Sequence, residues 1–316
     1  MKILITNAAS VTAISIAKIL KRGRITDLHI WGTEAQKYGY NSGSMIIDHY
    51  IQVPEVLSDY YVHSILEICK RNNINVLVPI LDEELYLFSK YKLQEYVKIL
   101  LPDIETVDFF RNKLLASTEL NNIFPGISPQ IYSDMHSVNC EKVIIRKNQS
   151  IGSQGIIVRD KEKLNISDFN NPDYFVQQYI EGTEYTVDML TDRYGDLKLV
   201  VPRKRLQIKN GVSTKVEITN DRQIIDICKT IYDKYRIPGL SNVQFIKTDN
   251  AIYFIELNMR FAGMGIASVL ASYDYISNYV LYLTDNENLG DFTDNMNKIK
   301  WGSVICRYYE ETVLMQ

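Results

Sequence analysis

The first hundred residues predict an α/β fold built on a parallel sheet, because short buried strands alternate there with helices. Residues 1–5 read MKILI and residues 76–81 read VLVPIL, and both are continuous apolar runs typical of buried strands. Residues 11–20 and 65–70 carry apolar residues at helical spacing, and residues 27–31 form a further strand. The alternation of strand and helix therefore predicts a parallel sheet flanked by helices.

A dinucleotide site of the Rossmann kind is the first function to weigh for such a sheet. The G-x-G-x-x-G fingerprint is absent after the first strand, where Ala8 and Ala9 occupy the turn that would approach a pyrophosphate. NAD binding is therefore disfavoured. Asp82 is expected to cap a helix that begins at Glu83, and an acidic first turn also suits the helix dipole. A contact between Asp82 and a substrate stays open as an alternative.

The overall composition is that of an ordinary globular protein and limits the partners. The 316 residues carry a formal net charge of -3 with a pI near 5.9, which argues against a nucleic-acid surface. No apolar run approaches the roughly 18 residues of a membrane span, so we expect a cytoplasmic protein with no membrane partner. The four cysteines lie far apart, and Cys69 and Cys228 fall in apolar helical patterns, so we expect buried free thiols.

Two strands near the C-terminal end carry polar residues on one side. Residues 242–247 and 252–258 flank a turn, and if Thr248 pairs with Ile252, Gln244 lies opposite Glu256. Gln244, Glu256 and Asn258 would then offer three oxygen ligands, which suits Mg²⁺, and the guanidinium of Arg260 suits a phosphate or carboxylate. The alternative is a solvated polar face of the sheet.

A polar loop at residues 148–155 lies between two strands, at 142–146 and 156–159. It contains small residues that would let backbone N–H groups surround phosphates, and these are Ser150, Gly152, Ser153 and Gly155. It lacks the G-x-x-x-x-G-K-[ST] pattern of a P-loop, so a plain hairpin is the alternative. Arg146, at the end of the apolar strand, would place a cation near those phosphates.

Taken together, these segments resemble the ATP-grasp superfamily, and most of all its carbamoyl phosphate synthetase type. VIIRKNQSIGSQGI matches the family's strand, basic residue and glycine-containing loop, QQYIEGTE matches its adenine hinge, and NVQF with FIELNMR matches its metal strands. The segments occur in family order over roughly residues 109–265. The resemblance implies a pre-ATP-grasp Rossmann-like domain at 1–105, a lid subdomain at 106–175 and a C-terminal subdomain with the metal site at 176–316.

The resemblance also implies a role for each matching residue. Lys113 and Arg146 would contact the ATP phosphates, Gln177 the adenine amino group, and the backbones of Gln178 and Ile180 the edge of the base. Glu184 would bind the ribose hydroxyls, and Lys215 would contact the γ-phosphate. Mg²⁺ (or Mn²⁺) would be held by Gln244, Glu256 and Asn258. Arg260 would stabilise the phosphorylated intermediate. Two features depart from the family: Gln177 stands where an acid is common, and the phosphate loop has few glycines. For Lys113 and Glu184 the alternatives are a solvated lysine and a strand-edge acid.

The function implied by the resemblance is an ATP-dependent ligase. A carboxylate would attack the γ-phosphate to give an acyl phosphate and ADP, and an amine or thiol would then displace phosphate. Small-molecule acid and amine substrates, ATP and Mg²⁺ follow as ligands, and a homodimer is possible. A bicarbonate-activating carboxylase or carbamoyl phosphate synthetase-like enzyme would use the same ATP residues, and a non-catalytic nucleotide-binding regulator is a further alternative.

Overall fold

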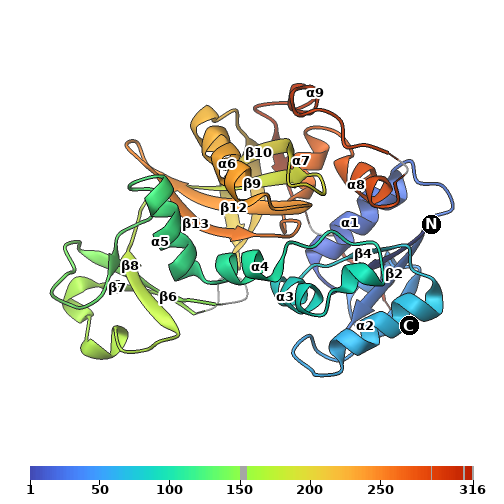
Figure 1. The fold of residues 1–316 in the computed structure, drawn as a ribbon, viewed down its shortest axis with the longest axis horizontal. Coiled ribbons are helices and arrows are strands. Elements are labelled where there is room, and N and C mark those ends of the chain that lie inside the picture. The colour runs from blue at the N-terminus through green and yellow to red at the C-terminus, as the bar shows by residue number, and fades with distance from the viewer. Residues whose placement is uncertain (150–154, 286, 309, 315–316) are drawn as a thin grey trace.

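The computed structural model describes residues 1–149, 155–285, 287–308 and 310–314. Its N-terminal sheet has the strand order β3-β2-β1-β4 with every pair parallel (Figure 1). The strands and their helices are β1 (Lys2–Ile5), α1 (Val11–Arg22), β2 (His29–Glu34), β3 (His49–Gln52), α2 (Tyr61–Asn72), β4 (Val76–Val78) and α3 (Asp82–Lys90). The predicted parallel α/β arrangement of the first hundred residues is confirmed.

Of the three helices of this first sheet, α1 begins at a side-chain cap, whereas α2 and α3 do not. The Ser10 side chain accepts a hydrogen bond from the Ala13 N–H and caps α1. Asp82 does not cap α3 as predicted, because Leu81 takes the capping position and Asp82 is the first residue of the helix. The Asp82 carboxylate instead accepts hydrogen bonds from Arg260, so the acid is used in a contact between distant parts of the chain.

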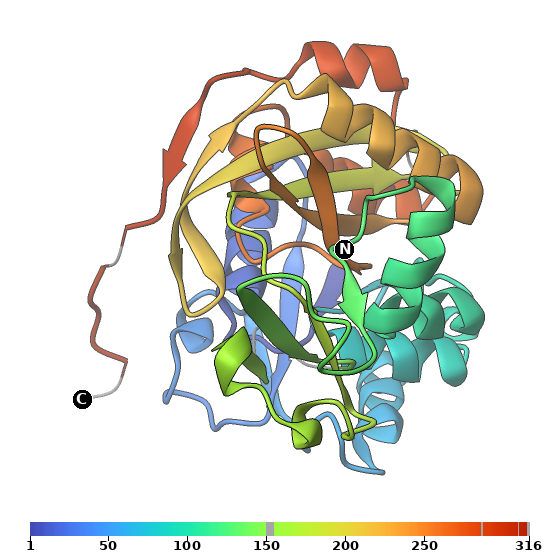
Figure 2. The same cartoon turned by 90° about the vertical axis from the view of Figure 1, so that its left-hand side faces the viewer.

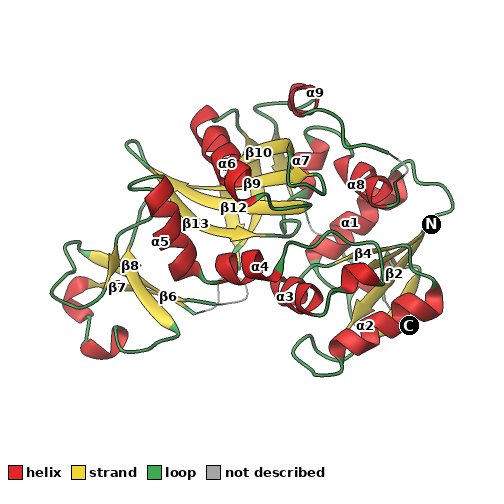
Figure 3. Cartoon of the chain, viewed as in Figure 1, coloured by secondary structure: helices red, strands yellow, loops and turns green. Residues whose placement is uncertain are grey.

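A second, smaller sheet follows, with the order β5-β8-β6-β7 and antiparallel pairing (Figure 3). Its strands are β5 (Ile131–Tyr132), β6 (Lys142–Lys147), β7 (Ile156–Asp160) and β8 (Tyr174–Gln178). It has its own buried cluster, formed by Tyr132, Val138, Val143, Ile145, Leu164 and Val176. We call residues 131–178 the lid. The predicted boundary at 175/176 is wrong, because it cuts through β8.

The third and largest sheet has the order β13-β12-β9-β10-β11-β14, also antiparallel. Its strands are β9 (Thr183–Thr191), β10 (Leu197–Lys209), β11 (Val212–Ile218), β12 (Leu240–Lys247), β13 (Ile252–Asn258) and β14 (Val304–Cys306). The accompanying helices are α4 (Ile104–Arg111), α5 (Lys113–Ile123), α6 (Arg222–Tyr235), α7 (Ile266–Leu270), α8 (Tyr275–Leu283) and α9 (Phe292–Asn297).

The large sheet packs against α-helices. The predicted amphipathic helix at 224–235 is confirmed as α6, which buries Ile224, Cys228 and Ile231 against the sheet. Helices α4 and α5 pack in the same core, with Val107 and Leu120 buried there. The predicted lid segment at 106–175 therefore starts too early, because its two helices belong with the large sheet.

The first sheet and the large sheet share a continuous apolar core. Helix α1 lies between the first sheet and α8, and Ile3 and Ile16 belong to the same buried cluster as Val201 and Tyr275 (Figures 1 and 2). The four cysteines are free, and Cys69 and Cys228 are buried as predicted. In the part of the chain that the structure describes, no helix is both long enough and apolar enough to cross a bilayer.

The hairpin of β12 and β13 has an irregular register. Lys247 pairs with Ile252, so the predicted pairing of Thr248 with Ile252 is wrong and the turn is one residue longer on that side. Ile255 is an extra residue that forms a β-bulge, because Phe245 pairs with Phe254 while Gln244 pairs with Glu256. The bulge offsets the longer turn, and the predicted opposition of Gln244 and Glu256 is therefore confirmed.

Candidate functional site

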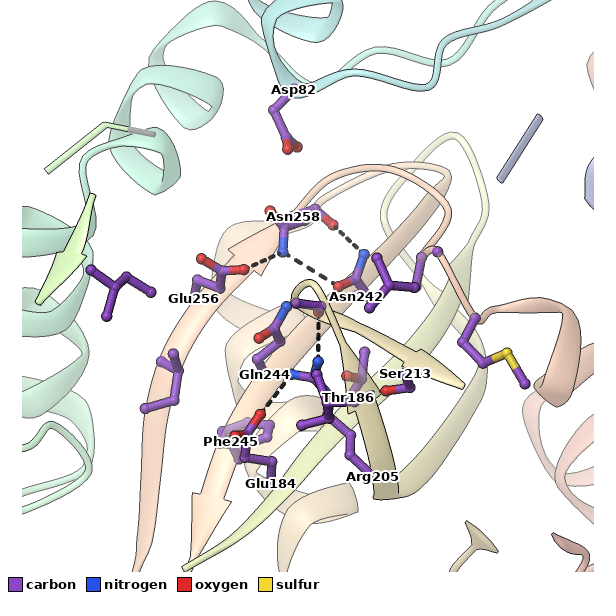
Figure 4. Close-up of a pocket in the computed structure, with 18 of the residues that line it drawn as sticks. Asp82, Glu184, Thr186, Arg205, Ser213, Asn242, Gln244, Phe245, Glu256 and Asn258 are labelled. Carbon is purple, nitrogen blue, oxygen red and sulfur yellow. Dashed lines mark hydrogen bonds and ion pairs between the residues drawn. The ribbon is translucent and has the colours of Figure 1, made fainter. Parts of the chain in front are cut away.

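A cleft of about 630 Å³ lies where the three sheets meet (Figure 4). The first sheet contributes the turn after β1 and the start of α3, the lid contributes β6 and β8, and the large sheet contributes the polar face of β9, β10, β12 and β13. Polar residues that line it include Asp82, Lys113, Arg146, Gln177, Glu184, Arg203, Arg205, Asn242, Gln244, Glu256, Asn258 and Arg260. Most of the predicted site residues are thus brought to one cavity.

The three predicted oxygen ligands lie together on the hairpin. The Asn258 side-chain amide donates to Glu256 Oε1 at 3.1 Å, and Gln244 lies across from Glu256 in the neighbouring strand (Figure 4). Asn242, which the sequence analysis missed, is directly opposite Asn258, and its Oδ1 lies 3.4 Å from the Asn258 amide nitrogen. The set offers one carboxylate and several amide oxygens, a hard-oxygen group that fits Mg²⁺.

Two cations flank the Glu256 carboxylate. Glu256 Oε2 lies 3.8 Å from Lys113 Nζ and 3.9 Å from Arg146 Nη2. Burial raises the pKa of Glu256, but Lys113, Arg146, the Asn258 hydrogen bond and Arg260 outweigh burial and hold that pKa below its ordinary value. Burial lowers the pKa of Lys113, while Glu256 opposes that shift. Lys113 is buried and lines the cleft, so the alternative of a solvated lysine is wrong.

Arg146 joins the lid to the large sheet. Its Nη1 and Nη2 each lie 3.3 Å from the carbonyl oxygen of Ile255, and Nη1 lies 3.5 Å from Gln177 Oε1. The Gln177 amide donates to the Pro129 carbonyl at 3.2 Å. Gln177 is 1% exposed and is held inside the lid by these contacts, although it also lines the cleft.

The hinge between the lid and the large sheet forms the apolar end of the cleft. Gln178 and Ile180 line the cleft there, together with Ile144, Ile156 and Ile246. The isoleucines come from the lid, the hinge and the large sheet, so a flat apolar group can lie between them. This position agrees with the predicted contacts of the Gln178 and Ile180 backbones with a base.

Next to this end, Glu184 is held by an arginine that the sequence analysis missed. Arg205 Nη1 donates to Glu184 Oε2 at 2.7 Å, Nε donates to Ser213 at 2.9 Å, and Nη2 donates to the Gly211 carbonyl at 2.6 Å. Burial lowers the pKa of Arg205, and Glu184 opposes that shift. Glu184 lines the cleft, so it is more than a strand-edge acid.

Lys215 does not reach the cleft. Gln207 pairs with Lys215 and Ile208 with Ser213, so Thr214 is an extra residue on β11 and breaks the alternation of sides. Ser213 lines the cleft, whereas Lys215 is exposed and is not among the lining residues. The prediction that Lys215 contacts the γ-phosphate is therefore wrong.

The predicted phosphate loop is described only at its ends. Ser150, Gly152 and Ser153 lie outside the described residues. Gly155 has a φ of +74°, and a Cβ there would lie 3.2 Å from Lys147 Cβ, so its backbone requires glycine. Gly155 lines a neighbouring cavity that shares Lys113, Glu256 and Asn258 with the main cleft.

Arg260 is held by the first sheet's helix α3. Its Nε and Nη2 donate to Asp82 Oδ2 at 2.9 and 2.7 Å. Burial lowers the pKa of Arg260, but Asp82 and Glu256 reverse that effect and raise the pKa above its ordinary value. Arg260 therefore stands as a permanent cation at the edge of the cleft, two residues beyond Asn258 on the same chain segment.

A cleft between a small lid and a larger sheet, with an acid and an amide on adjacent strands, defines the class of nucleotide-dependent proteins known as ATP-grasp. The chain has the ATP-grasp fold, preceded by a parallel-sheet domain. Residues 170–302 match the family described as "ATP-grasp in the biosynthetic pathway with Ter operon", and residues 3–100 match the "PylC-like, N-terminal domain" family.

Known proteins similar to the chain include a ligase, a synthase and a carboxylase. A D-alanine–D-alanine ligase of Fusobacterium nucleatum is 24% identical over 71% of the chain and 78% of its own length. The large chain of a Clostridium botulinum carbamoyl phosphate synthase is 27% identical over 37% of the chain and 12% of its own length. The biotin carboxylase domain of Hydrogenobacter thermophilus 2-oxoglutarate carboxylase, solved with MgADP and bicarbonate, has a TM-score of 0.71 at 13% identity over 96% of the chain and 73% of its own.

Proposed function

We propose that the protein is an ATP- and Mg²⁺-dependent ligase that joins a carboxylate to an amine or thiol through an acyl phosphate and releases ADP and phosphate. The observation that carries the proposal is the placement of the Glu256 carboxylate. It is flanked by Lys113 and Arg146, bonded to Asn258, and followed just beyond the end of β13 by Arg260. Such a set neutralises phosphate charge without offering a protein nucleophile.

In this proposal the nucleotide lies along the cleft from the hinge to the hairpin. The base lies between the isoleucines at the hinge, where the backbones of Gln178 and Ile180 reach its edge. Glu184, held by Arg205, binds the ribose hydroxyls. Gln177 is bonded to Arg146 and Pro129, and in this proposal its side-chain oxygen also accepts from the adenine amino group.

The phosphates then lie between the lid and the hairpin. Lys113 and Arg146 neutralise their charge from one side, and Glu256, Asn258 and Gln244 hold Mg²⁺ from the other. Mg²⁺ held by these residues would supply positive charge to the phosphate oxygens during transfer. Glu256 keeps its negative charge at neutral pH because its pKa lies below the ordinary value.

The proposed reaction has two steps. A carboxylate oxygen of the acid attacks the γ-phosphorus, the bond to the bridging oxygen of ADP breaks, and an acyl phosphate forms. The amine nitrogen then attacks the acyl carbon, phosphate leaves with the electron pair of the broken C–O bond, and the amine loses a proton to water. Arg260 stabilises the negative charge that both steps place on the acyl and phosphoryl oxygens.

A bicarbonate-activating enzyme is a second candidate. The Hydrogenobacter thermophilus carboxylase domain was solved with bicarbonate, and bicarbonate would use the same ATP residues in this chain. Incubation with ATP, Mg²⁺ and ¹³C-bicarbonate as the only acid separates the two candidates. Release of ADP that depends on bicarbonate favours the second, and release that depends on an organic acid favours the ligase. Binding of ATP without release of ADP under either condition indicates a non-catalytic regulator.

The experiment that tests the proposal compares Glu256→Gln with Glu67→Gln in a screen of acid and amine pairs. Glu67 is an exposed acid on α2, far from the cleft, and serves as the matched control. We expect ADP release with one group of acids by wild type and Glu67→Gln, and a loss of at least about 100-fold in Glu256→Gln. If the turnover of Glu256→Gln stays within a few-fold of the wild-type value, Glu256 is not a metal ligand.

A further inference from the structure

Arg203 is a buried cation in the floor of the cleft, and one edge of its guanidinium has no partner. The side chain is 1% exposed and lines the cleft. Nε and Nη2 donate to the two Asp188 oxygens at 2.6 and 2.8 Å. Among the described residues, buried Nη1 has no hydrogen-bond partner. A buried charged donor left unpaired is costly, so its presence indicates a site built for an acceptor.

The contacts around Arg203 fix the guanidinium. Asp188 lies on β9 and also accepts a hydrogen bond from Ser268 on α7. The guanidinium is therefore fixed by Asp188 on β9, and Asp188 is fixed in turn by Ser268 on α7. Nη1 is the nitrogen that remains for a ligand. Arg203 stands beside Thr186 in the sheet register, and Thr186 also lines the cleft.

Arg203 lies at the end of the cleft that the nucleotide does not need. Arg205, two residues along the same face of β10, holds Glu184 at the ribose end, so Arg203 lies further from the hinge. The walls here are the start of α1 and the segment after β13. A Cβ on Gly263 would lie 3.1 Å from Val212 Cγ1 and 3.8 Å from Thr12 Oγ1, so the walls are close together.

We propose that Arg203 Nη1 binds a second carboxylate of the acid substrate, remote from the carboxylate that is phosphorylated. This inference rests on the proposed ligase function and specifies its substrate class. Asp188 neutralises most of the guanidinium charge, so the free edge offers one N–H group rather than a full charge, which suits a singly charged carboxylate better than a dianionic phosphate.

The sheet register sets the length of such an acid. Asn258 pairs with Asn242, and Asn242 pairs with Asp188 on β9. Arg203 lies on β10, the next strand, so the reacting end and Arg203 are three strands apart. Three strand spacings are about 14 Å, and side chains project inward from both ends. Extended dicarboxylates from succinate to pimelate cover the distance that remains.

The test measures binding of succinate, glutarate, adipate and pimelate, each beside its monoamide, to the protein saturated with Mg²⁺ and a non-hydrolysable ATP analogue. For at least one pair we expect calorimetry to show the dicarboxylate bound at least about 10-fold more tightly than the monoamide. Arg203→Lys keeps a cation for Asp188 but removes Nη1, so this preference should fall to within about twofold while analogue binding is unchanged. Arg193→Lys, at an exposed ion pair with Asp285, is the matched control and should keep the preference.

Equal binding of dicarboxylate and monoamide by wild type, or an unchanged preference in Arg203→Lys, overturns the inference. If Arg203→Lys does not fold, the pair Arg203→Met with Asp188→Leu removes both charges together and takes its place, with the same expected loss. A different result would contradict the proposed ligase function: neither dicarboxylates nor monocarboxylates would support the release of ADP from ATP.

Discussion

Arg146, on the lid, donates from both terminal nitrogens to the carbonyl oxygen of Ile255, the bulge residue of β13. The bulge leaves Ile255 without a partner on β12, and its carbonyl is used to anchor the lid instead. The next residue is Glu256, which lies 3.9 Å from the same guanidinium. One arginine thus joins the lid to β13.

We expect Arg146→Lys to weaken ATP binding, because a lysine keeps the charge near Glu256 but cannot donate from two nitrogens to Ile255. The KM for ATP should rise roughly 10-fold, with a smaller fall in kcat. Arg159→Lys is the control on the same lid sheet, since Arg159 pairs with Asp168 away from the cleft. An unchanged KM in Arg146→Lys would contradict the anchoring role.

The depressed pKa of Glu256 predicts a specific dependence of stability on pH. The folded pKa lies below the ordinary 4.5, so the unfolded state binds more protons near that pH. The stability that ionised Glu256 contributes is fully present above pH 4.5 and is lost as the pH falls through the folded pKa. Thermal melts followed by circular dichroism should show a steeper fall of Tm below about pH 5 for wild type than for Glu256→Gln. Parallel curves would mean that Glu256 is not held by its cations.

Asp82→Asn should slow the chemical steps while sparing ATP binding. The substitution removes the charge that holds Arg260 from helix α3, and Arg260 then loses its fixed position. We expect kcat to fall roughly 10-fold with the KM for ATP within about twofold, as for an interaction used in the transition state. Asp59→Asn, at an exposed position of the same domain, should match wild type. A rise in the KM for ATP alone would place Asp82 in nucleotide binding.

The hinge placement is tested at Ile180. Ile180→Leu should barely change ATP affinity, because the proposed contact is made by the backbone. Ile180→Pro removes the N–H donor and should abolish binding. The two variants are compared by calorimetry with a non-hydrolysable ATP analogue, and circular dichroism checks that the proline variant is folded. Equal affinity for the proline variant would show that the N–H is not used.

The sequence predicted the site best where regular alternation places side chains. The opposition of Gln244 and Glu256 followed from counting along the hairpin of β12 and β13. That count succeeded although the turn was assigned one residue too short, because the bulge at Ile255 compensated for the error. Lys215 was proposed from the resemblance and not from such a count, and the irregular pairing of β10 with β11 places it outside the lining of the cleft.

Long-range partners were the part that the sequence could not supply. The pairing of Asp82 with Arg260 joins residues 178 positions apart, and no local pattern marks it. Arg203 and Arg205 stood inside a basic run whose members looked alike, and their place in the lining of the cleft separates them from Lys204 and Lys209. Asn242 was part of the quoted NVQF match but carried no role, although its place across from Asn258 follows from the same register that placed Gln244.

The most direct test of the central claim is the trapping of an acyl phosphate. The protein is incubated with ATP, Mg²⁺ and an acid that supports ADP release, first without any amine and then with hydroxylamine. We predict a hydroxamate of that acid with stoichiometric ADP and phosphate, and a fall of about 100-fold or more in Arg260→Lys, which keeps the charge but loses the planar donor fork. Formation of AMP and pyrophosphate in place of ADP and phosphate would contradict the acyl-phosphate mechanism.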